Sequence, residues 1–352
     1  MHFMVTLRHR MTEAVLPDTF PIYMKLNISI NETPPSCCAV SRDTPQHTPA
    51  DFNLRDPVSS KSTVDSDMSL VPGGVFSMGT DYEGAFSSDG EGPVRKVYID
   101  PFYIDKIAVT NTKFARFTKE TGYKTEAEKF GWSFVFYLFI AERAGISSLQ
   151  SPSGTPWWKR IDGSSWRHPE GPSSNIRERM NHPVIHVSWN DAVEYCNWSG
   201  KRLPTEAEWE FAARGGLNKK IFPWGDELTP KGAHRCNIWQ GTFPNDNSEE
   251  DGFAGTAPAK HYEPNDYGLY NMVGNVWEWQ SDWFSPTFHS RGSQTEPAHN
   301  PQGPIRGTTK TIKGGSYLCH DSYCNRYRVA ARSANTPDSS TGNLGFRCVF
   351  DA

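Results

Sequence analysis

The stretch Gly314-Gly-Ser-Tyr-Leu-Cys-His-Asp-Ser-Tyr-Cys-Asn-Arg-Tyr-Arg328 places two cysteines, Cys319 and Cys324, five positions apart near the end of a 352-residue chain. The whole chain has only seven cysteines. Thiolates are soft ligands that select soft ions such as Cu(I), and a nearby cation or hydrogen-bond donor raises the thiolate fraction available for redox chemistry. Taken alone, the same spacing also fits an ordinary disulfide or two thiols of a hydrophobic core.

The composition around this stretch indicates a loop-rich domain with a core of large rings. Aromatic residues make up 13% of the chain, with 12 tryptophans, beside 29 glycines and 26 prolines. The formal net charge of -4 gives no reason to expect nucleic acid or an anionic membrane as a partner. The longest apolar run, residues 134–141, is too short to cross a bilayer, and we expect a strand or a buried helical turn there.

The chain divides into an arm and one domain. Residues 1–68 lack hydrophobic periodicity and are rich in Pro, Ser, Thr and Asp, which predicts a flexible N-terminal arm. Residues 69–352 alternate apolar clusters with turn signals, which predicts a single domain. Residues 143–180, rich in Ser, Gly and Pro, are expected to form a surface excursion.

Capping signals predict three helices in the domain. The first starts after Thr110 and ends at Gly122. The second starts at Ser188, with Asp191 in a capping-box position. The third has the capping pair Thr205 and Glu208, with Gly215 as its stop.

Five blocks of sequence carry a resemblance to a known family. They are Val71-Pro-Gly-Gly-Val-Phe-Ser-Met-Gly79, His182-Pro-Val-Ile-His-Val-Ser-Trp-Asn-Asp191, Arg202-Leu-Pro-Thr-Glu-Ala-Glu-Trp-Glu210, Tyr267-Gly-Leu-Tyr-Asn-Met-Val-Gly-Asn-Val-Trp-Glu-Trp279, and the stretch around the cysteine pair with Asn335-Thr-Pro-Asp-Ser-Ser340 and Asn343-Leu-Gly-Phe-Arg-Cys348. Together they closely resemble the formylglycine-generating enzymes, the sulfatase-modifying factor family. The resemblance implies an α+β fold: a single loop-rich domain of low regularity, related to the C-type lectin fold.

The resemblance implies an oxidase that acts on protein cysteines. Enzymes of this family convert the cysteine of a Cys-x-Pro-x-Arg segment in unfolded, nascent sulfatases into Cα-formylglycine, consuming O2, and so activate the sulfatases. Cys319 and Cys324 would hold Cu(I), and the substrate thiolate would become a third sulfur ligand. By the same resemblance, Ser316 would orient O2 or water and Trp277 would shield the pocket. For His320, the roles of a base and of a hydrogen-bonded wall both stay open.

Substrate recognition is implied for three further residues. Arg326, Ser340 and Asn343 match family positions that line the peptide groove, where an extended, unfolded chain would bind. Trp132 stands where close relatives carry an acid that helps to hold the substrate arginine. A cation–π contact, worth about 0.5–2 kcal/mol, can replace that acid, or the sequence preference of this chain is weaker or different.

The family resemblance also implies two structural calcium sites. Ca2+ takes carboxylate, side-chain amide and backbone carbonyl oxygens. The first site would use the side chains of Asn237 and Asp251 and the carbonyls of Ile238 and Phe253. The second would use Asn271, Gly274, Val276 and Glu278, with backbone oxygens from the middle two.

Three other cysteines sort by comparison with the family. Cys196 and Cys348 match a structural disulfide, whose loop of roughly 150 residues would stabilise the fold by about 5 kcal/mol on the chain-entropy model. Ala213 and Val329 occupy the places of a second family disulfide, so that bond is missing here. Cys236 has no match and is expected to be a buried free thiol.

The expected compartment is the lumen of the endoplasmic reticulum, where relatives that serve eukaryotic sulfatases reside. The first thirty residues show no signal peptide of ordinary form. Sequons at Asn27, Asn31 and Asn197 would be used only in a secretory compartment. Cys37 and Cys38, adjacent in the arm, would serve thiol exchange with other proteins.

One alternative remains within the family. A paralogue keeps the fold but lacks the cysteine pair, and it acts as a sulfatase-binding or regulatory protein without catalysis. The presence of both Cys319 and Cys324 favours the enzyme.

Overall fold

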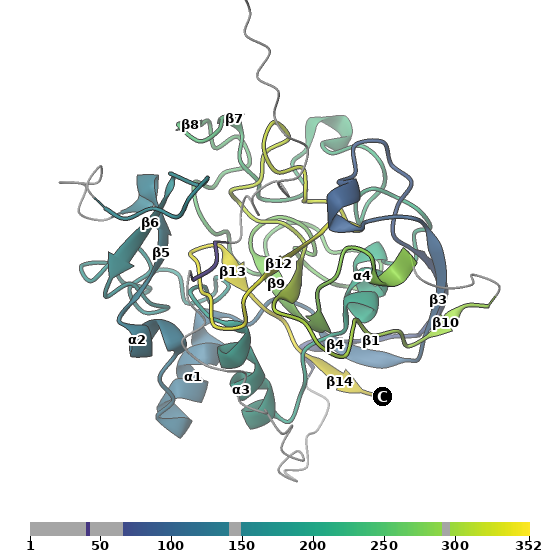
Figure 1. Cartoon of the computed structure of the whole chain (residues 1–352), viewed down its shortest axis with the longest axis horizontal. Helices are drawn as coiled ribbons and strands as arrows, with labels where there is room; N and C mark the ends of the chain where they lie inside the picture. Colours follow the sequence, from purple (N-terminus) through teal and green to yellow (C-terminus); the bar gives the residue numbers. More distant parts are fainter. Residues whose placement is uncertain (1–39, 43–65, 141–148, 291–295) are drawn as a thin grey trace, which may run out of the picture. The chain divides into compact units, whose positions relative to one another are not determined.

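The computed structural model describes residues 40–42, 66–140, 149–290 and 296–352. Within them lie four α-helices: α1 (Asn111–Thr121), α2 (Glu126–Phe130), α3 (Trp189–Ser199) and α4 (Glu206–Arg214). The strands are β1 (Met68–Val71), β2 (Gly74–Met78), β3 (Arg95–Ile99), β4 (Phe102–Asp105), β5 (Trp132–Phe136), β6 (Trp158–Asp162), β7 (Gly241–Thr242), β8 (Asp246–Asn247), β9 (Trp277–Trp283), β10 (Ala298–His299), β11 (Lys310–Lys313), β12 (Arg332–Asn335), β13 (Leu344–Gly345) and β14 (Val349–Asp351). Short elements joined by long irregular segments confirm the predicted α+β class and its low regularity (Figure 1).

Helices α1, α3 and α4 confirm the three predicted from capping signals. Thr110, Ser188 and Thr205 each accept a hydrogen bond from the backbone of the first turn. Each helix ends at a glycine in the left-handed region, as an αL cap requires. Helix α2 was not predicted from the sequence, although it too has a full capping box, formed by Thr125 and Glu128.

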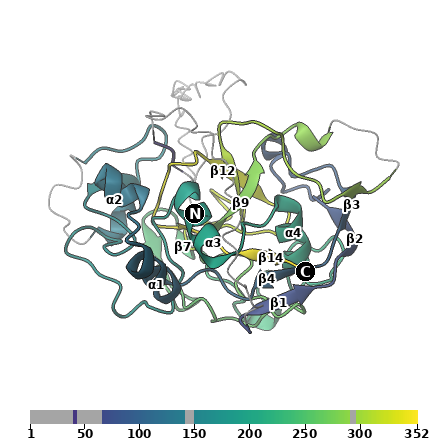
Figure 2. The same cartoon turned by 90° about the horizontal axis from the view of Figure 1, so that it is seen from below.

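Five small sheets organise the strands. The four-stranded sheet has the order β12-β11-β9-β13, with β13 parallel to β9 and the other pairs antiparallel. The remaining sheets are β1-β4-β14, β10-β3-β2, β5-β6 and β7-β8. Figures 1 and 2 show β9 and β12 close together, with the β1-β4-β14 sheet nearby. The loop from β11 to β12 carries both Cys319 and Cys324, so this sheet anchors the cysteine stretch.

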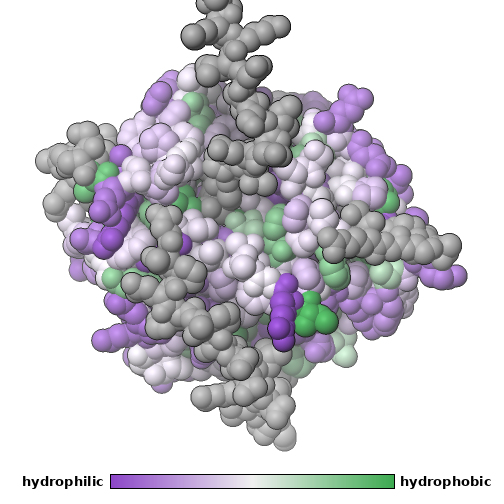
Figure 3. Space-filling model, in the orientation of Figure 1, coloured by the Kyte–Doolittle hydropathy of each residue, from purple (hydrophilic) through white to green (hydrophobic). Residues whose placement is uncertain are grey.

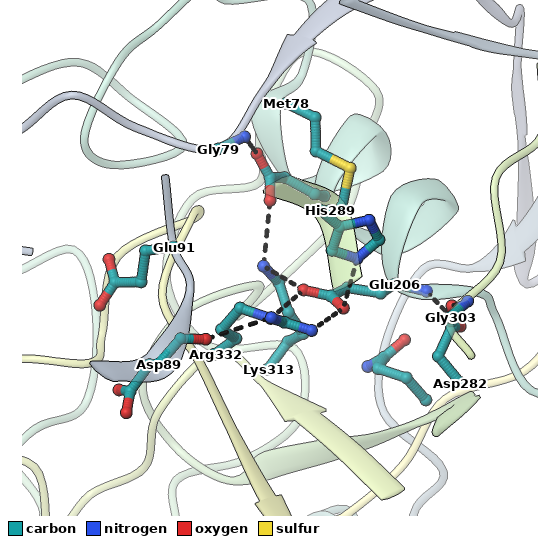
Figure 4. Close-up of polar contacts among 12 residues, drawn as sticks. Met78, Gly79, Asp89, Glu91, Glu206, Asp282, His289, Gly303, Lys313 and Arg332 are labelled. Atoms are coloured by element: carbon teal, nitrogen blue, oxygen red, sulfur yellow. Dashed lines mark hydrogen bonds and ion pairs between the residues drawn. The ribbon is translucent and has the colours of Figure 1, made fainter. Parts of the chain in front are cut away.

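A buried ionic network holds α4 against the four-stranded sheet. The Lys313 ammonium at the end of β11 lies 3.0 Å from a carboxylate oxygen of Glu210 and 3.7 Å from one of Glu206. Arg332 on β12 pairs with Glu206 at 2.7 Å, and Figure 4 shows Lys313 and Arg332 converging on that carboxylate. Leaving one of these buried charges without its partner would be costly. The network therefore favours the one position of α4 in which all of them are paired.

Two expectations about irregular segments need correction. The segment 143–180 is more than a surface excursion: it contributes β6, which pairs with β5, and the fully buried rings of Trp158 and Trp166. Its Ser, Gly and Pro content predicted an exposed loop. A few large buried rings are nevertheless enough to hold such a segment in the core. The predicted arm also contains a docked segment, since Val40 and Arg42 are buried, and β1 begins at Met68, inside the predicted arm boundary.

The run from residue 134 forms the end of β5 and then a 3-10 turn at Tyr137–Phe139. No helix in the described ranges is long and apolar enough to cross a membrane. The face drawn in Figure 3 is largely polar, with small scattered apolar areas.

Candidate active site

The two cysteines of the opening stretch lie together in the interior. Their sulfur atoms are 3.2 Å apart and both residues are fully buried. The backbone brings them together through two turns, because the Cys319 amide donates to the Ser316 carbonyl and the Cys324 amide donates to the His320 carbonyl. A disulfide has sulfur atoms about 2.05 Å apart, so the structure shows two adjacent thiols.

Arg326 supplies a positive charge beside this pair. Its Nη1 lies 3.9 Å from the Cys324 sulfur, and its Nε donates to Asp89 at 2.6 Å. The guanidinium also lies over the ring of Phe86, 4.0 Å from its centre. Arg326 is therefore a charged neighbour of the Cys324 sulfur, and its contact with substrate stays a prediction.

Ser316 and Asn343 form a polar corner next to Cys319. The Ser316 hydroxyl oxygen accepts hydrogen bonds from Asn343 Nδ2 at 3.0 Å and from the Leu318 amide at 3.3 Å. That oxygen lies 4.0 Å from the Cys319 sulfur. Because its acceptor capacity is used by two N–H groups, the hydroxyl hydrogen is free to be donated to a further acceptor.

Trp277 lies on β9 next to this corner. Its backbone amide donates to the Asn343 carbonyl at 2.9 Å, and its ring belongs to the same apolar cluster as Cys319 and Cys324. The ring is 1% exposed and its Nε1 has no hydrogen-bond partner. Trp277 is therefore a buried ring of the core cluster that also contains both cysteines, and its role as a shield of the pocket stays a prediction.

His320 is held within its own loop. Its Nδ1 lies 2.8 Å from the Ser322 hydroxyl and 3.2 Å from the Asp321 carboxylate. These contacts are compatible with both predicted roles, the hydrogen-bonded wall and the base.

Ser340 belongs to a second group of hydrogen-bonded side chains, close to the strand that begins with Trp132. The Ser340 hydroxyl is 2.9 Å from that of Ser133, and Ser133 in turn is 2.8 Å from Nδ1 of His186. His186 is fully buried, has a φ of 59° and has a pKa lowered to about 3 by burial, so its ring is neutral. Sequence reasoning missed both Asp89 and His186; a buried histidine with left-handed backbone is visible only in three dimensions.

The proposed residues of the first calcium site converge. Asp251 accepts hydrogen bonds from the amides of Ile238 and Phe253, at 2.9 and 3.1 Å. Asn237 Oδ1 is buried without a partner. Burial raises the pKa of Asp251, and the ion pairs of the described residues include none to this carboxylate. Gln240 Nε2 donates to Asp251 Oδ2 at 3.0 Å and to the Ile238 carbonyl at 2.6 Å. A hard cation would replace this amide and use the unsatisfied Asn237 oxygen as well.

The second predicted site fits calcium less well. Glu278 accepts two hydrogen bonds from Arg347 and one from Trp209, each at 2.7 Å. Its charge is therefore already balanced by a buried guanidinium. Asn271 Oδ1 is buried without a partner, which leaves one side-chain oxygen available there.

The remaining cysteines lie where the sequence placed them. The sulfurs of Cys196 on α3 and Cys348 are 3.4 Å apart and buried, so the pair is aligned while the bond itself stays a prediction. Ala213 and Val329 are buried in the main apolar core, and Cys236 is a buried free thiol, as expected. Cys37, Cys38, Asn27 and Asn31 lie outside the described residues. Asn197 is exposed on α3.

With this geometry in view, comparison with known proteins decides the family. The model of the sulfatase-modifying factor enzyme 1-like domain matches residues 55–352. The chain belongs to this family. It is 56% identical to a formylglycine-generating enzyme of Thermomonospora curvata over 85% of this chain and 98% of that protein.

Three further proteins are similar to this chain. A formylglycine-generating enzyme of Mus musculus is 58% identical over 80% of this chain and 74% of its own length. A protein of Bos taurus named inactive C-alpha-formylglycine-generating enzyme 2 is 46% identical over 81% of this chain and 88% of its own. The solved structure of PvdO from Pseudomonas aeruginosa, at 23% identity and a TM-score of 0.58 over 83% of this chain and 98% of that one, shows a shared fold. The predicted family and fold class are confirmed.

Proposed function

We propose that this chain is a formylglycine-generating enzyme: it oxidises the cysteine of a Cys-x-Pro-x-Arg segment in unfolded sulfatases to Cα-formylglycine and so activates them. The observation that carries the proposal is the pair of buried sulfurs of Cys319 and Cys324, 3.2 Å apart. Identities of 56% and 58% to proteins named for this activity, against 46% to one named inactive, favour the catalytic branch.

We propose that Cys319 and Cys324 hold Cu(I). Two thiolates are the donors that select this ion, and no group of three His, Cys, Asp or Glu side chains suited to a metal occurs among the described residues. The sulfur of the substrate cysteine would join the two as a further soft ligand, as the family resemblance implies. Bound copper would supply the electron transfer that allows O2, the co-substrate, to react at that sulfur.

The protein groups around the pair have separate tasks. Arg326 keeps a positive charge 3.9 Å from the Cys324 sulfur, next to the proposed copper ligands. Ser316, held by Asn343, directs its hydroxyl toward the reacting region. Trp277 excludes water, which would otherwise compete for reactive species.

We also propose Ca2+ as a structural ion, with the Asn237, Ile238, Asp251 and Phe253 site as the better of the two. Its ligands belong to an irregular segment without long strands, where an ion would hold the loop. The Asn271, Gly274, Val276 and Glu278 site would require Glu278 to share its carboxylate with Arg347.

The proposed compartment is the secretory pathway, specifically the lumen of the endoplasmic reticulum. An oxidising lumen would allow the aligned thiols of Cys196 and Cys348 to bond, and the exposed Asn197 sequon would be accessible to glycosylation. Microscopy of the tagged chain in its own cells would test this: a cytosolic signal would contradict it.

The activity is tested by incubating the copper-loaded protein with a Cys-x-Pro-x-Arg peptide and capturing the aldehyde with a hydrazide. We expect turnover in the wild type and none in Cys319→Ser or Cys324→Ser, with unchanged thermal unfolding. Cys236→Ser is the matched control, because Cys236 is a buried thiol outside the pair. Most activity surviving in either site variant would remove the dithiolate from the mechanism.

A further inference from the structure

Part of the N-terminal arm lies against the region where the substrate arginine is expected. Val40–Arg42, the short purple segment in Figure 1, runs beside the yellow C-terminal loop near β13. Arg42 is 6% exposed. Its guanidinium carbon lies 3.9 Å from the centre of the Trp132 ring and 4.2 Å from that of Phe130. Trp132 is the residue that replaces the acid expected to hold a substrate arginine.

The contacts of this segment are those by which a groove binds an extended peptide. Asn335 Nδ2 donates to the Val40 carbonyl at 3.1 Å, and its Oδ1 accepts from the Ser41 hydroxyl at 2.7 Å. The Arg42 amide donates to the Ser339 hydroxyl at 2.9 Å. When side chains of a groove bind the main-chain groups of a peptide, the groove recognises the peptide in an extended form.

The side chain of Arg42 is held by the predicted groove residue Ser340. Nη2 donates to the Ser340 hydroxyl at 3.2 Å and to the Trp132 carbonyl at 3.1 Å, and Nε donates to the Asp338 carbonyl at 3.1 Å. Val40 belongs to the same apolar cluster as Tyr317 and Leu318, which directly precede Cys319. The segment thus connects the arginine-binding patch with the surroundings of the sulfur pair.

The sequence of the arm matches the substrate pattern at the same positions. Cys38-Ala-Val-Ser-Arg42 has a cysteine and an arginine at the spacing of Cys-x-Pro-x-Arg, with Val40 in the place of proline. Cys38 itself lies outside the described residues. The two described positions of the pattern, Val40 and Arg42, are both buried against the domain.

Arg42 is bound differently from three buried arginines of the domain core. Arg214, Arg328 and Arg347 each pair with a buried glutamate, at 2.5–2.7 Å. Arg42 has no ion pair with a carboxylate of the described residues, and its Nη1 is buried without a partner. A buried charge without a paired carboxylate is costly, so Arg42 would leave its position at a lower free-energy cost than these three arginines.

We propose that Val40–Arg42 act as a built-in pseudosubstrate, filling the groove that binds the Pro-x-Arg part of a sulfatase segment and competing with it. The inference rests on the proposed function for the identity of the substrate. Because of this competition, the apparent dissociation constant for substrate equals the intrinsic one divided by the fraction of molecules whose groove is open. An unfolded sulfatase segment that carries the same pattern binds the same groove and so displaces the arm.

The test measures binding of a fluorescein-labelled Cys-x-Pro-x-Arg peptide to the full chain by fluorescence anisotropy. Arg42→Ala is expected to tighten binding, by about tenfold if the arm fills nine grooves in ten. Arg42→Lys should fall between Arg42→Ala and the wild type. Arg116→Ala is the control, since Arg116 is an exposed arginine paired with Glu120 on α1. Unchanged or weaker binding to Arg42→Ala would overturn the proposal.

A second measurement needs no variant. A synthetic peptide covering residues 36–46 is added to the wild type with the labelled substrate peptide. It should displace the label, and the same peptide with alanine at position 42 should not. Equal displacement by both, or none by either, would contradict the pseudosubstrate. Because neither experiment depends on turnover, a lack of aldehyde formation would disprove the proposed function separately from the arm.

Discussion

At the scale of single residues, the site depends on the hydrogen bonds that fix the side chains next to the Cys319 and Cys324 sulfurs. Ser316 shows this most clearly, because Asn343 and the Leu318 amide occupy its oxygen and leave its hydrogen to be donated. Arg326 is held in the same manner by Asp89 on one side and the Phe86 ring on the other. Pre-organised groups of this kind stabilise a developing charge without reorganising.

We predict that Ser316→Ala lowers kcat at least about tenfold with little change in KM, because the lost donor acts on the reacting region and not on the peptide. Steady-state kinetics with the Cys-x-Pro-x-Arg peptide would measure this. Ser322→Ala is the control, since Ser322 is an exposed serine of the same loop that contacts only His320 in the described residues. A pure KM effect would place Ser316 in peptide binding instead.

Asp251 leads to a prediction about calcium. Its burial and raised pKa make a nearby cation favourable, and an ion that binds only the folded chain stabilises it by mass action. We expect Tm to rise when Ca2+ is added to EGTA-treated protein, and Asp251→Asn to abolish most of that rise. Asp246→Asn, at an exposed position in the same segment, should keep it. A full rise in Asp251→Asn would remove this residue from the calcium site.

At the scale of elements, α4 shows how a short helix is fixed by charge as well as by apolar packing. Glu210 accepts hydrogen bonds from Arg214 and from the Gly79 amide, while Lys313 approaches its other oxygen. Burial alone would raise the pKa of Glu210, but Lys313 and Arg214 lower it to about 2. Helix α4 is thereby tied to both β2 and β11.

This network predicts a pH dependence of stability. The folded pKa of Glu210 lies below its unfolded value, so its contribution is complete above about pH 5 and is lost as the pH falls toward about 2. We expect Glu210→Gln to lower the free energy of unfolding by about 3 kcal/mol at pH 7 and to flatten its decline in acid. Urea unfolding at several pH values measures both. Glu120→Gln, at an exposed ion pair, should change neither; an equally steep acid decline in Glu210→Gln would refute the assignment.

At the scale of the whole molecule, residues far apart in sequence close the domain. Cys196 and Cys348, 152 positions apart, bring α3 next to the C-terminal strand region. If the bond forms, Cys196→Ser should lower the free energy of unfolding by about 5 kcal/mol under oxidising conditions. Under reducing conditions the wild type should lose most of that advantage. Cys236→Ser serves as the control, and non-reducing peptide mass spectrometry reports the bond directly; two free thiols in oxidised protein would contradict the pairing.

Local sequence determined the three capped helices and the five motif blocks, because a capping box or a glycine stop depends on residues within one turn. It also determined the family and the identity of the sulfur pair, whose chemistry follows from residue type. The long loops carried no periodic signal, so β6 followed only from its pairing with β5. The burial of Trp158 and Trp166 followed only from packing against the rings of Phe136 and Phe114.

Only the tertiary structure decided which groups surround the sulfurs and the substrate arginine. Asp89 beside Arg326, His186 beside Ser133 and Arg42 on Trp132 join segments that no local pattern connects. Glu278, a predicted calcium ligand by motif, is found bound to Arg347 for the same reason. Which side chains come within hydrogen-bonding distance of one another depends on how the core packs. The packing of the core depends on the whole chain.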